Sequence, residues 1–396
     1  MDLDDARAAR QTLQGVSEVT PLTHSRWLHE LTGRDVRLKC ENLQRAGSFK
    51  IRGAYTRIAR LSDQERARGV VAASAGNHAQ GVALAAAKLG ARATIFMPHG
   101  AALPKVQATL GYGAEVRFHG LGVTEALVAA AEFAEQTGAT LIHPFDHPDI
   151  IAGQATVGLE IVEQLPEVST ILVPLGGGGL AAGIALLKSE RPDITVVGVQ
   201  AEAAAAYPGS LAEGIPVEAD LGSTMADGIA VSRPGAVPFG LIREHLDGVV
   251  TVSEESMSQA LIGLLERAKL LAEPAGSVGV AALLEYPDRF DGPVVPVLSG
   301  GNIDALLLLE VIRHGLASGG RFLMFRVRIS DRPGELMRLL TELAQMDVNI
   351  LNVNHDRGSE ALGVREVEVA LQVATRGNAH REEVWRRLTE LGYDPS

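Results

Sequence analysis

The sequence lacks most of the residues that mark secreted or membrane-bound proteins. It has a single cysteine, Cys40, so an intrachain disulfide is excluded, and we expect Cys40 to be a small apolar member of the strand VRLKC. No apolar run reaches membrane-spanning length, and the start, MDLDDARAAR, lacks the basic and apolar segments of a signal peptide. We therefore expect a cytoplasmic protein.

Basic clusters are missing as well. The formal net charge is −12 with Lys and Arg dispersed, which argues against a nucleic acid or an anionic membrane as partner. Hydrophobic residues make up 46% and no Ser/Gln/Pro-rich tract occurs, so the chain is expected to be compact. At 396 residues it is long enough for two or three folding units and a catalytic core that acts on small molecules.

What is present is a regular alternation of short apolar runs with longer Ala/Leu-rich segments. Runs such as GVVAAS, ATIFMP and STILVPL alternate with helical patterns to about residue 315, which predicts an α/β fold of parallel sheets with helices on both faces. After Gly319 and Gly320 the order becomes βαββα, typical of a split βαβ module. We place a domain boundary at this glycine pair.

The most glycine-rich segment, VPLGGGGLAAG at residues 173–183, follows a predicted strand and begins a helix. Unpaired N–H groups and the helix dipole favour a phosphate there, and glycine lets the backbone approach it closely. A rival interpretation is a dinucleotide site, because Gly176, Gly178 and Ala181 fit a loose G-x-G-x-x-A pattern and Glu202 ends the next strand. The loop alone leaves both open.

Two further turns carry polar groups. ASAGNHAQG, residues 73–81, presents Ser74, Asn77 and a row of backbone amides that would suit a carboxylate, or else one of these side chains simply caps the helix. VLSGGN places Ser299 at the carboxyl end of an apolar strand, where open sheets bind ligands, although such a serine is often a cap.

The segment ENLQRAGSFKIRGAY places Lys50 between Phe49 and Ile51. A lone lysine is usually solvated. Together with a phosphate loop, a carboxylate turn and a hydroxyl at a strand end, however, a lysine is what an enzyme that uses pyridoxal phosphate requires.

These motifs resemble those of the threonine and serine dehydratases, which are fold type II pyridoxal-phosphate enzymes. The resemblance runs from residue 21 to about 315 through ENLQRAGSFKIRGA, SAGNHAQG, HPDIIAGQAT, PLGGGGLAAG, AEPAG and LSGGN, in the expected order. It implies a tryptophan-synthase-β-like fold in which residues 1–318 form the catalytic domain, with a smaller parallel-sheet subdomain at about 53–145 inserted in the larger one. Through the segments RVRISDRPGEL and VNILNVNHDR, residues 319–396 resemble an ACT domain, an α+β, ferredoxin-like module that senses amino acids.

The resemblance also implies a role for each site residue, with pyridoxal 5'-phosphate as cofactor. Lys50 would bind the cofactor aldehyde as a Schiff base and later take the Cα proton of the substrate. Phe49 would lie along the ring, Asn77 would bind its phenolic oxygen and Ser299 would meet its nitrogen. The phosphate would be held by Gly176, Gly177, Gly178, Gly179 and Leu180. The substrate carboxylate would be held by Ser74, Ala75, Gly76, Asn77 and His78.

Two departures from the family pattern narrow the expectation. Serine racemases have a second serine, a base for the opposite ring face, where this chain has Ala75, so dehydration alone is favoured. Members that bind a divalent ion use a carboxylate after the strand-end Glu202, but Pro208 stands at that position. We therefore expect no metal site, although main-chain carbonyls could still bind a monovalent cation.

The implied activity is that of an L-threonine ammonia-lyase, which converts L-threonine to 2-oxobutanoate and ammonia and also acts on L-serine. Dehydration of serine or 3-hydroxyaspartate is the alternative within the family. An NAD-linked oxidoreductase would leave Lys50, the SAGNH turn and Ser299 unexplained. An amino-acid-sensing protein that has lost activity is opposed by their joint presence.

In the ACT-like region, SDRPGEL predicts a helix that starts near Pro333 and leaves free N–H groups for the carboxylate of an effector. The resemblance implies a branched-chain amino-acid site between two copies of the chain, in a homodimer or homotetramer. Its residues would be Asp331, Gly334, Glu335 and Asn349. The alternative is that the module only stabilises an oligomer.

Overall fold

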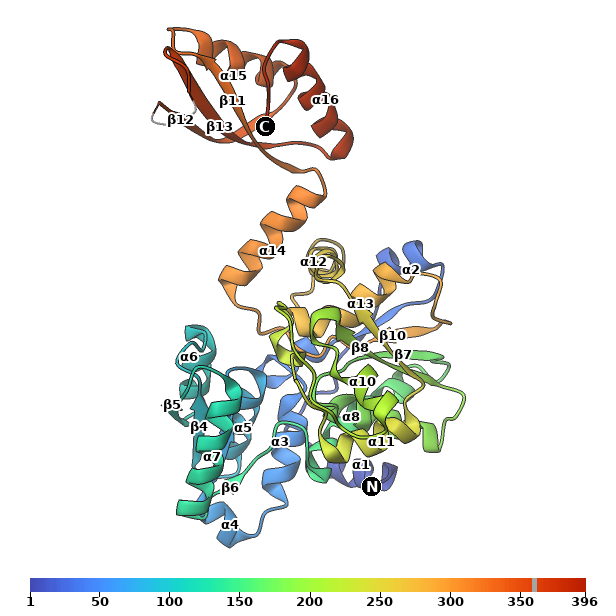
Figure 1. Cartoon of the computed structure of the whole chain (residues 1–396). Coiled ribbons are helices and arrows are strands. Elements are labelled where there is room, and N and C mark those ends of the chain that lie inside the picture. The colour runs from blue at the N-terminus through green and yellow to red at the C-terminus, as the bar shows by residue number, and fades with distance from the viewer. Residues whose placement is uncertain (358–361) are drawn as a thin grey trace. The chain divides into compact units, whose positions relative to one another are not determined.

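The computed structural model describes residues 1–357 and 362–396 and divides into two compact units, residues 1–307 and 308–396. Figure 1 shows their helices and strands. The division falls near the start of α14 (Ala305–Ser318), whereas the sequence predicted a boundary just after its end. Within the described ranges, no helix is both long enough and apolar enough to cross a membrane.

The first unit begins with α1 (Leu3–Thr12). A short antiparallel pair, β1 (Leu22–His24) and β2 (Arg37–Lys39), flanks α2 (Arg26–Thr32). Cys40 follows β2 directly and is fully buried, as expected of an apolar residue, although it lies just outside the strand. Two helices, α3 (Lys50–Ala59) and α4 (Asp63–Arg68), then lead to the first parallel sheet.

This smaller sheet has the strand order β5-β4-β3-β6 and is parallel throughout. Its strands are β3 (Val70–Ala73), β4 (Ala93–Met97), β5 (Glu115–Phe118) and β6 (Thr140–Leu141). Its helices are α5 (Asn77–Lys88), α6 (Leu103–Gly111) and α7 (Val123–Thr137). Alternate side chains of β3 enter different cores: Ala72 packs on the α5 side and Val71 on the α7 side, so both faces of the strand need apolar residues.

The larger sheet is also parallel, with the order β10-β7-β8-β9. Its strands are β7 (Thr170–Pro174), β8 (Thr195–Ala201), β9 (Gly248–Val252) and β10 (Val294–Pro296). Its helices are α8 (Pro148–Gln164), α9 (Gly179–Ala185), α10 (Ala206–Glu213), α11 (Ala236–His245), α12 (Glu254–Gly263) and α13 (Pro274–Glu285). The sequence of α13, PAGSVGVAALLE, is apolar nearly all round because the helix packs against β7, β8 and β9. The two parallel sheets confirm the predicted α/β class.

The second unit has the predicted βαββα order: β11 (Phe322–Ser330), α15 (Glu335–Gln345), β12 (Asn349–Asp356), β13 (Glu366–Ala374) and α16 (Asn378–Glu390). The strands form an antiparallel sheet in the order β11-β13-β12. Along β11, buried and exposed residues alternate, as expected for a sheet with one face on a core. Ser396 exchanges two backbone hydrogen bonds with Arg326, at 2.9 and 3.0 Å, so the end of the chain lies beside β11.

Candidate active site

A cavity of about 340 Å³ lies at the carboxyl ends of the parallel strands. Three segments that follow strands line it: residues 74–78 after β3, residues 176–180 after β7, and Ser299 after β10. Phe49 and Lys50, at the start of α3, complete this part of the wall. The fold thus brings together every residue that the sequence predicted for the cofactor and the substrate.

Lys50 is the first residue of α3 and borders the cavity. Its Nζ donates a hydrogen bond to the carbonyl of Pro144 at 3.0 Å and lies 5.2 Å from the centre of the Phe49 ring. Burial lowers the pKa of Lys50 to about 8, although the nearby charge of Glu273 raises it. The amine is therefore partly neutral near pH 7, and the neutral form is the one that can act as nucleophile or base.

The glycine turn after β7 has no room for side chains. A Cβ at Gly177 would lie 2.3 Å from the Phe145 ring, and one at Gly178 would lie 2.0 Å from Tyr207 Oη. Gly178 also has a φ of 101°, which favours glycine, and it is the N-cap of α9 without any side-chain cap. The first N–H groups of α9 are thus left for an anion. This cradle fits the phosphate of the predicted cofactor.

The turn after β3 forms a second uncapped helix start. Gly76 is the N-cap of α5, and no side chain among the described residues caps this helix. The alternative in which Ser74 or Asn77 is only a cap is therefore wrong. Ser74 Oγ instead accepts a hydrogen bond from the Gly76 N–H at 3.1 Å, within the turn. The first-turn N–H groups of α5 are left to bind a negatively charged ligand.

Asn77 links the cavity to a buried carboxyl group. Its Nδ2 donates to Glu273 Oε1 at 2.5 Å, and its Oδ1 accepts from Asn302 Nδ2 at 2.8 Å. Burial raises the pKa of Glu273 to about 7, although the hydrogen bond from Asn77 lowers it. Sequence reasoning gave Glu273 no role beyond the AEPAG motif. Glu273 borders the cavity and contacts Asn77, which is 196 positions away in the chain, and these two observations identify it as part of the site.

Ser299 is 4% exposed and borders the cavity. It does not cap a helix, because the next helix, α14, begins only at Ala305. Its carbonyl accepts a hydrogen bond from the Phe49 N–H at 3.1 Å. This contact holds the residue before Lys50 against the segment that follows β10.

Two residues of the turn after β3 are poorly suited to moving protons. His78 is buried, and its Nε2 donates to the carbonyl of Ile142 at 2.8 Å. Burial, with a smaller effect from the charge of Lys50, lowers the pKa of His78 to about 3, so the imidazole stays neutral. Ala75 borders the cavity and has no titratable group.

Sequence reasoning also missed a charged pair in the cavity wall. Lys105 in α6 and Asp227 in the short helix η5 (Asp227–Ile229) both border the cavity, and Lys105 Nζ lies 3.0 Å from Asp227 Oδ2. The two residues are 122 positions apart in the chain. No local pattern could therefore have indicated that they meet.

The dinucleotide interpretation of the glycine turn is not supported. Glu202 lies in a short helix, η4 (Glu202–Ala204), that follows β8. It is not one of the described residues that border the cavity. In the same described ranges, no three His, Cys, Asp or Glu side chains come together in a way that could hold a metal ion.

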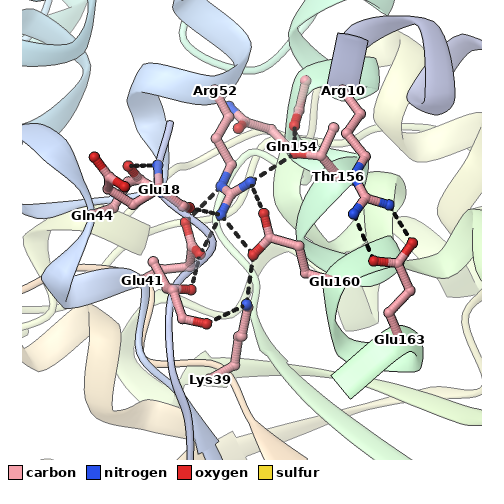
Figure 2. A network of polar contacts seen from close by, with 12 residues as sticks. Arg10, Glu18, Lys39, Glu41, Gln44, Arg52, Gln154, Thr156, Glu160 and Glu163 are labelled. Carbon is pink, nitrogen blue, oxygen red and sulfur yellow. Dashed lines mark hydrogen bonds and ion pairs between the residues drawn. The ribbon is translucent and has the colours of Figure 1, made fainter. Parts of the chain in front are cut away.

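A buried network of charges supports α3 close to Lys50 (Figure 2). Arg52 donates to the two carboxylate oxygens of Glu41, both at 2.8 Å, and to those of Glu160 at 2.6 and 3.0 Å. Lys39 Nζ donates to Glu160 at 2.6 Å. All four side chains are at most 4% exposed, and their charges balance. The network joins α3 to α8, to the end of β2 and to the segment that follows it.

Within one chain, Asn349 lies apart from the other predicted effector residues. Asn349 pairs with Ala374, whereas Ser330, just before Asp331, pairs with Glu366 at the opposite end of β13. The carboxylate of Asp331 accepts two hydrogen bonds from Arg357, both at 2.9 Å.

Gly334 is the N-cap of α15, which begins at Glu335, two residues after Pro333. The Glu335 N–H donates to the carbonyl of Arg332 at 3.3 Å. The expectation that this N–H is free was therefore wrong, because the chain closes a turn before the helix begins.

Comparison with known proteins finds relatives with a similar sequence and solved structures with a similar fold. A family model described as pyridoxal-phosphate dependent enzyme matches residues 14–300. The chain is 46% identical over 393 residues to the L-threonine ammonia-lyase of Thermotoga maritima, covering 99% of this chain and 98% of that protein. The processed form of threonine deaminase isoform 2 from Solanum lycopersicum matches with a TM-score of 0.74 at 35% identity, over 78% of this chain and 93% of that one. Maize serine racemase matches with a TM-score of 0.75 at 34% identity, over 80% of this chain and 98% of that one.

Proposed function

The chain belongs to the family of pyridoxal-phosphate dependent enzymes, and from this premise we propose that it is an L-threonine ammonia-lyase that converts L-threonine to 2-oxobutanoate and ammonia and also acts on L-serine. The observation that carries the proposal is the position of the Lys50 amine, in one cavity with two uncapped helix starts. One helix start suits a phosphate and the other a substrate carboxylate. The similarity to the L-threonine ammonia-lyase of Thermotoga maritima over nearly the whole chain supports this choice.

The residues of the cavity divide into those that would hold the cofactor and those that would hold the substrate. The N–H groups of the glycine turn and of α9 would hold the phosphate, with Phe49, Asn77 and Ser299 around the ring. When bound, pyridoxal phosphate supplies an aldehyde that reacts with amines and a conjugated ring that stabilises negative charge at the substrate Cα. The backbone of residues 74–78 would hold the substrate carboxylate and so orient the Cα–H bond.

Lys50 is the residue that would move the proton. Its neutral amine takes the proton from Cα, and its pKa of about 8 allows it to hold that proton and release it again near neutral pH. Glu273 also borders the cavity, where it accepts a hydrogen bond from Asn77. The β-hydroxyl then takes up a proton and leaves as water, and a second water hydrolyses the remaining enamine to the 2-oxo acid and ammonia.

Racemisation would need a second base on the opposite face of the substrate. Ala75 has no group that accepts a proton, and His78 is neutral and donates its Nε2–H to the carbonyl of Ile142. We therefore propose dehydration without racemisation, despite the similarity to maize serine racemase.

The test is to incubate the purified enzyme with L-threonine, L-serine and 3-hydroxyaspartate in turn, and to measure release of the 2-oxo acid. We expect the highest kcat/KM for L-threonine, and no D-serine from L-serine by chiral chromatography. A clear preference for 3-hydroxyaspartate would replace the proposed substrate. D-Serine formed at a rate comparable to elimination would refute the role given to Ala75.

For the second unit we propose a regulatory, ACT-like domain of residues 319–396 that binds a branched-chain amino acid between two copies of the chain. Among the described strands, β12 lies at an edge of the sheet, opposite β11. If two copies pair along this edge in antiparallel fashion, Asn349 of one copy approaches the end where Asp331 and Gly334 of the other lie. A homodimer or homotetramer would therefore complete a site that one chain leaves divided.

L-Isoleucine or L-valine is expected to shift the threonine saturation curve of the full-length enzyme by roughly 5–150-fold in apparent affinity, the usual range of allosteric coupling. A chain ending at Ser318 should keep its cofactor, because every cavity residue precedes that point, but should not respond. If calorimetry detects no binding of either amino acid, the tail has only a structural role.

We also propose the cytoplasm as the site of action. Cys40 is buried, and burial raises the pKa of its thiol to about 11, so it is unreactive at neutral pH. A chain whose only cysteine is buried and forms no disulfide suits a reducing compartment.

A further inference from the structure

The ion pair between Lys105 and Asp227 crosses the wall of the cavity. Lys105 belongs to α6 of the smaller sheet, and Asp227 lies in η5, which belongs to the larger part of the first unit. The side chain of Lys105 is 14% exposed, whereas that of Asp227 is 65% exposed. The lysine is therefore enclosed in the wall, and the aspartate is largely solvated.

The ammonium of Lys105 also lies beside the turn that follows β3. A Cβ added to Gly76 would lie 3.8 Å from Lys105 Nζ. Gly76 is the N-cap of α5, whose first N–H groups have no side-chain cap. A lysine ammonium and the positive end of a helix thus border the same space, which favours a carboxylate there over a neutral group.

We propose that Lys105 is a specificity-determining residue that binds the α-carboxylate of the amino-acid substrate, and that Asp227 competes with this carboxylate for it. The inference rests on the proposed function, which assigns the turn of residues 74–78 to the substrate. A bound carboxylate gains the N–H groups of α5 as well as the ammonium, so it has more donors than Asp227 has. Asp227 can return to water with little loss because exposed ion pairs are weak.

The two partners therefore have opposite effects on substrate binding. In Lys105→Met the carboxylate loses a charged donor, and KM for L-threonine should rise about 10-fold or more. In Asp227→Asn the competitor loses its charge, and KM should fall by roughly 2–5-fold. The changes should appear in KM more than in kcat, because the contact is present both in the bound substrate and in the transition state. If the ion pair were purely structural, both variants would raise KM.

Binding can also be measured without turnover. L-2-Aminobutyrate has the carboxylate of threonine but no β-hydroxyl, and in L-2-aminobutanamide an uncharged carboxamide replaces that carboxylate. By calorimetry on the holoenzyme, Lys105→Met should bind L-2-aminobutyrate about 10-fold or more weakly than the wild type does, whereas its affinity for L-2-aminobutanamide should be unchanged. Lys105→Arg should retain most of the preference for the acid. Lys188→Met is the matched control, because Lys188 pairs with Asp247 at 2.8 Å and does not border the cavity.

The outcomes separate this inference from the proposed function. If the wild type fails to release a 2-oxo acid from L-threonine but Lys105→Met still loses preference for the acid over the amide, the inference stands and the function fails. If both Lys105→Met and Asp227→Asn raise KM, or if acid and amide weaken equally in Lys105→Met, the pair only holds the wall together and the inference is wrong.

Discussion

Replacing Lys50 by alanine is expected to remove both the visible absorbance of the bound cofactor and the turnover of L-threonine. Lys50 is the amine that borders the cavity beside the Phe49 ring, and burial keeps its pKa near 8. The turn after β3 offers no replacement base, because Ala75 has none and His78 is tied to a carbonyl. We expect kcat to fall by at least about 10²–10⁴-fold, which is the usual contribution of a positioned base.

The measurement compares purified wild type and Lys50→Ala after incubation with pyridoxal phosphate and gel filtration. Borohydride reduction followed by mass spectrometry should find the cofactor attached to Lys50 in the wild type only. The rate of cofactor uptake by the wild-type apoenzyme should rise with pH through about 8, because the fraction of neutral amine rises there. Lys188→Ala, at a lysine outside the cavity wall, serves as control. A Lys50→Ala enzyme that remained coloured and active would refute the role.

The parts of the site that were predictable from the sequence are those encoded locally. Backbone N–H groups are left exposed where a strand is followed by glycines or by SAGNH and then by a helical pattern. Parallel strands bring such turns to one edge of a sheet. The contacts of Glu273 with Asn77 and of Lys105 with Asp227 join residues 196 and 122 positions apart. Such pairs depend on how two sheets are placed around one cavity, which no local pattern records.

The C-terminal unit illustrates the same limit. Its βαββα order follows from the change in hydrophobic periodicity, and the alternating burial along β11 agrees with it. The sequence did not reveal that Asn349 and Asp331, both named as effector residues, lie at opposite ends of the sheet within one chain. The N–H of Glu335 was misjudged for a local reason, because the chain forms a turn to Arg332 before α15 begins.

Arg52→Met is expected to destabilise the first unit by about 3–5 kcal/mol, because removing one partner of a buried ion pair leaves charges uncompensated. The side chain of Arg52 is 1% exposed and binds two carboxylates, those of Glu41 and Glu160 (Figure 2). Burial alone would raise the pKa of Glu41, but the charge of Arg52, its hydrogen bonds and the charge of Lys39 outweigh it, so the pKa lies below its ordinary value. Nothing in the letters SFKIRG distinguishes this buried arginine from a solvated one on a helix surface.

Urea unfolding of the apoenzymes, followed by circular dichroism, would measure this loss, and apoenzymes are used because a bound cofactor would add its own stabilisation. Arg10→Met is the matched control. Arg10 forms an ion pair with Glu163 in the same region (Figure 2), but the two side chains are 40% and 53% exposed, so its loss should cost less than about 1 kcal/mol.

The effect of Arg52→Met should also depend on pH. The pKa of Glu41 is lower in the folded state than its ordinary value of 4.5, so its charge stabilises the fold fully at pH values above 4.5. This stabilisation is lost as the pH falls through the folded pKa. The difference between wild type and Arg52→Met should therefore be largest near neutral pH and narrow below about pH 4.5. Equal, small losses in Arg52→Met and Arg10→Met would mean that the buried network does not hold α3, and that the position of Lys50 depends on apolar packing alone.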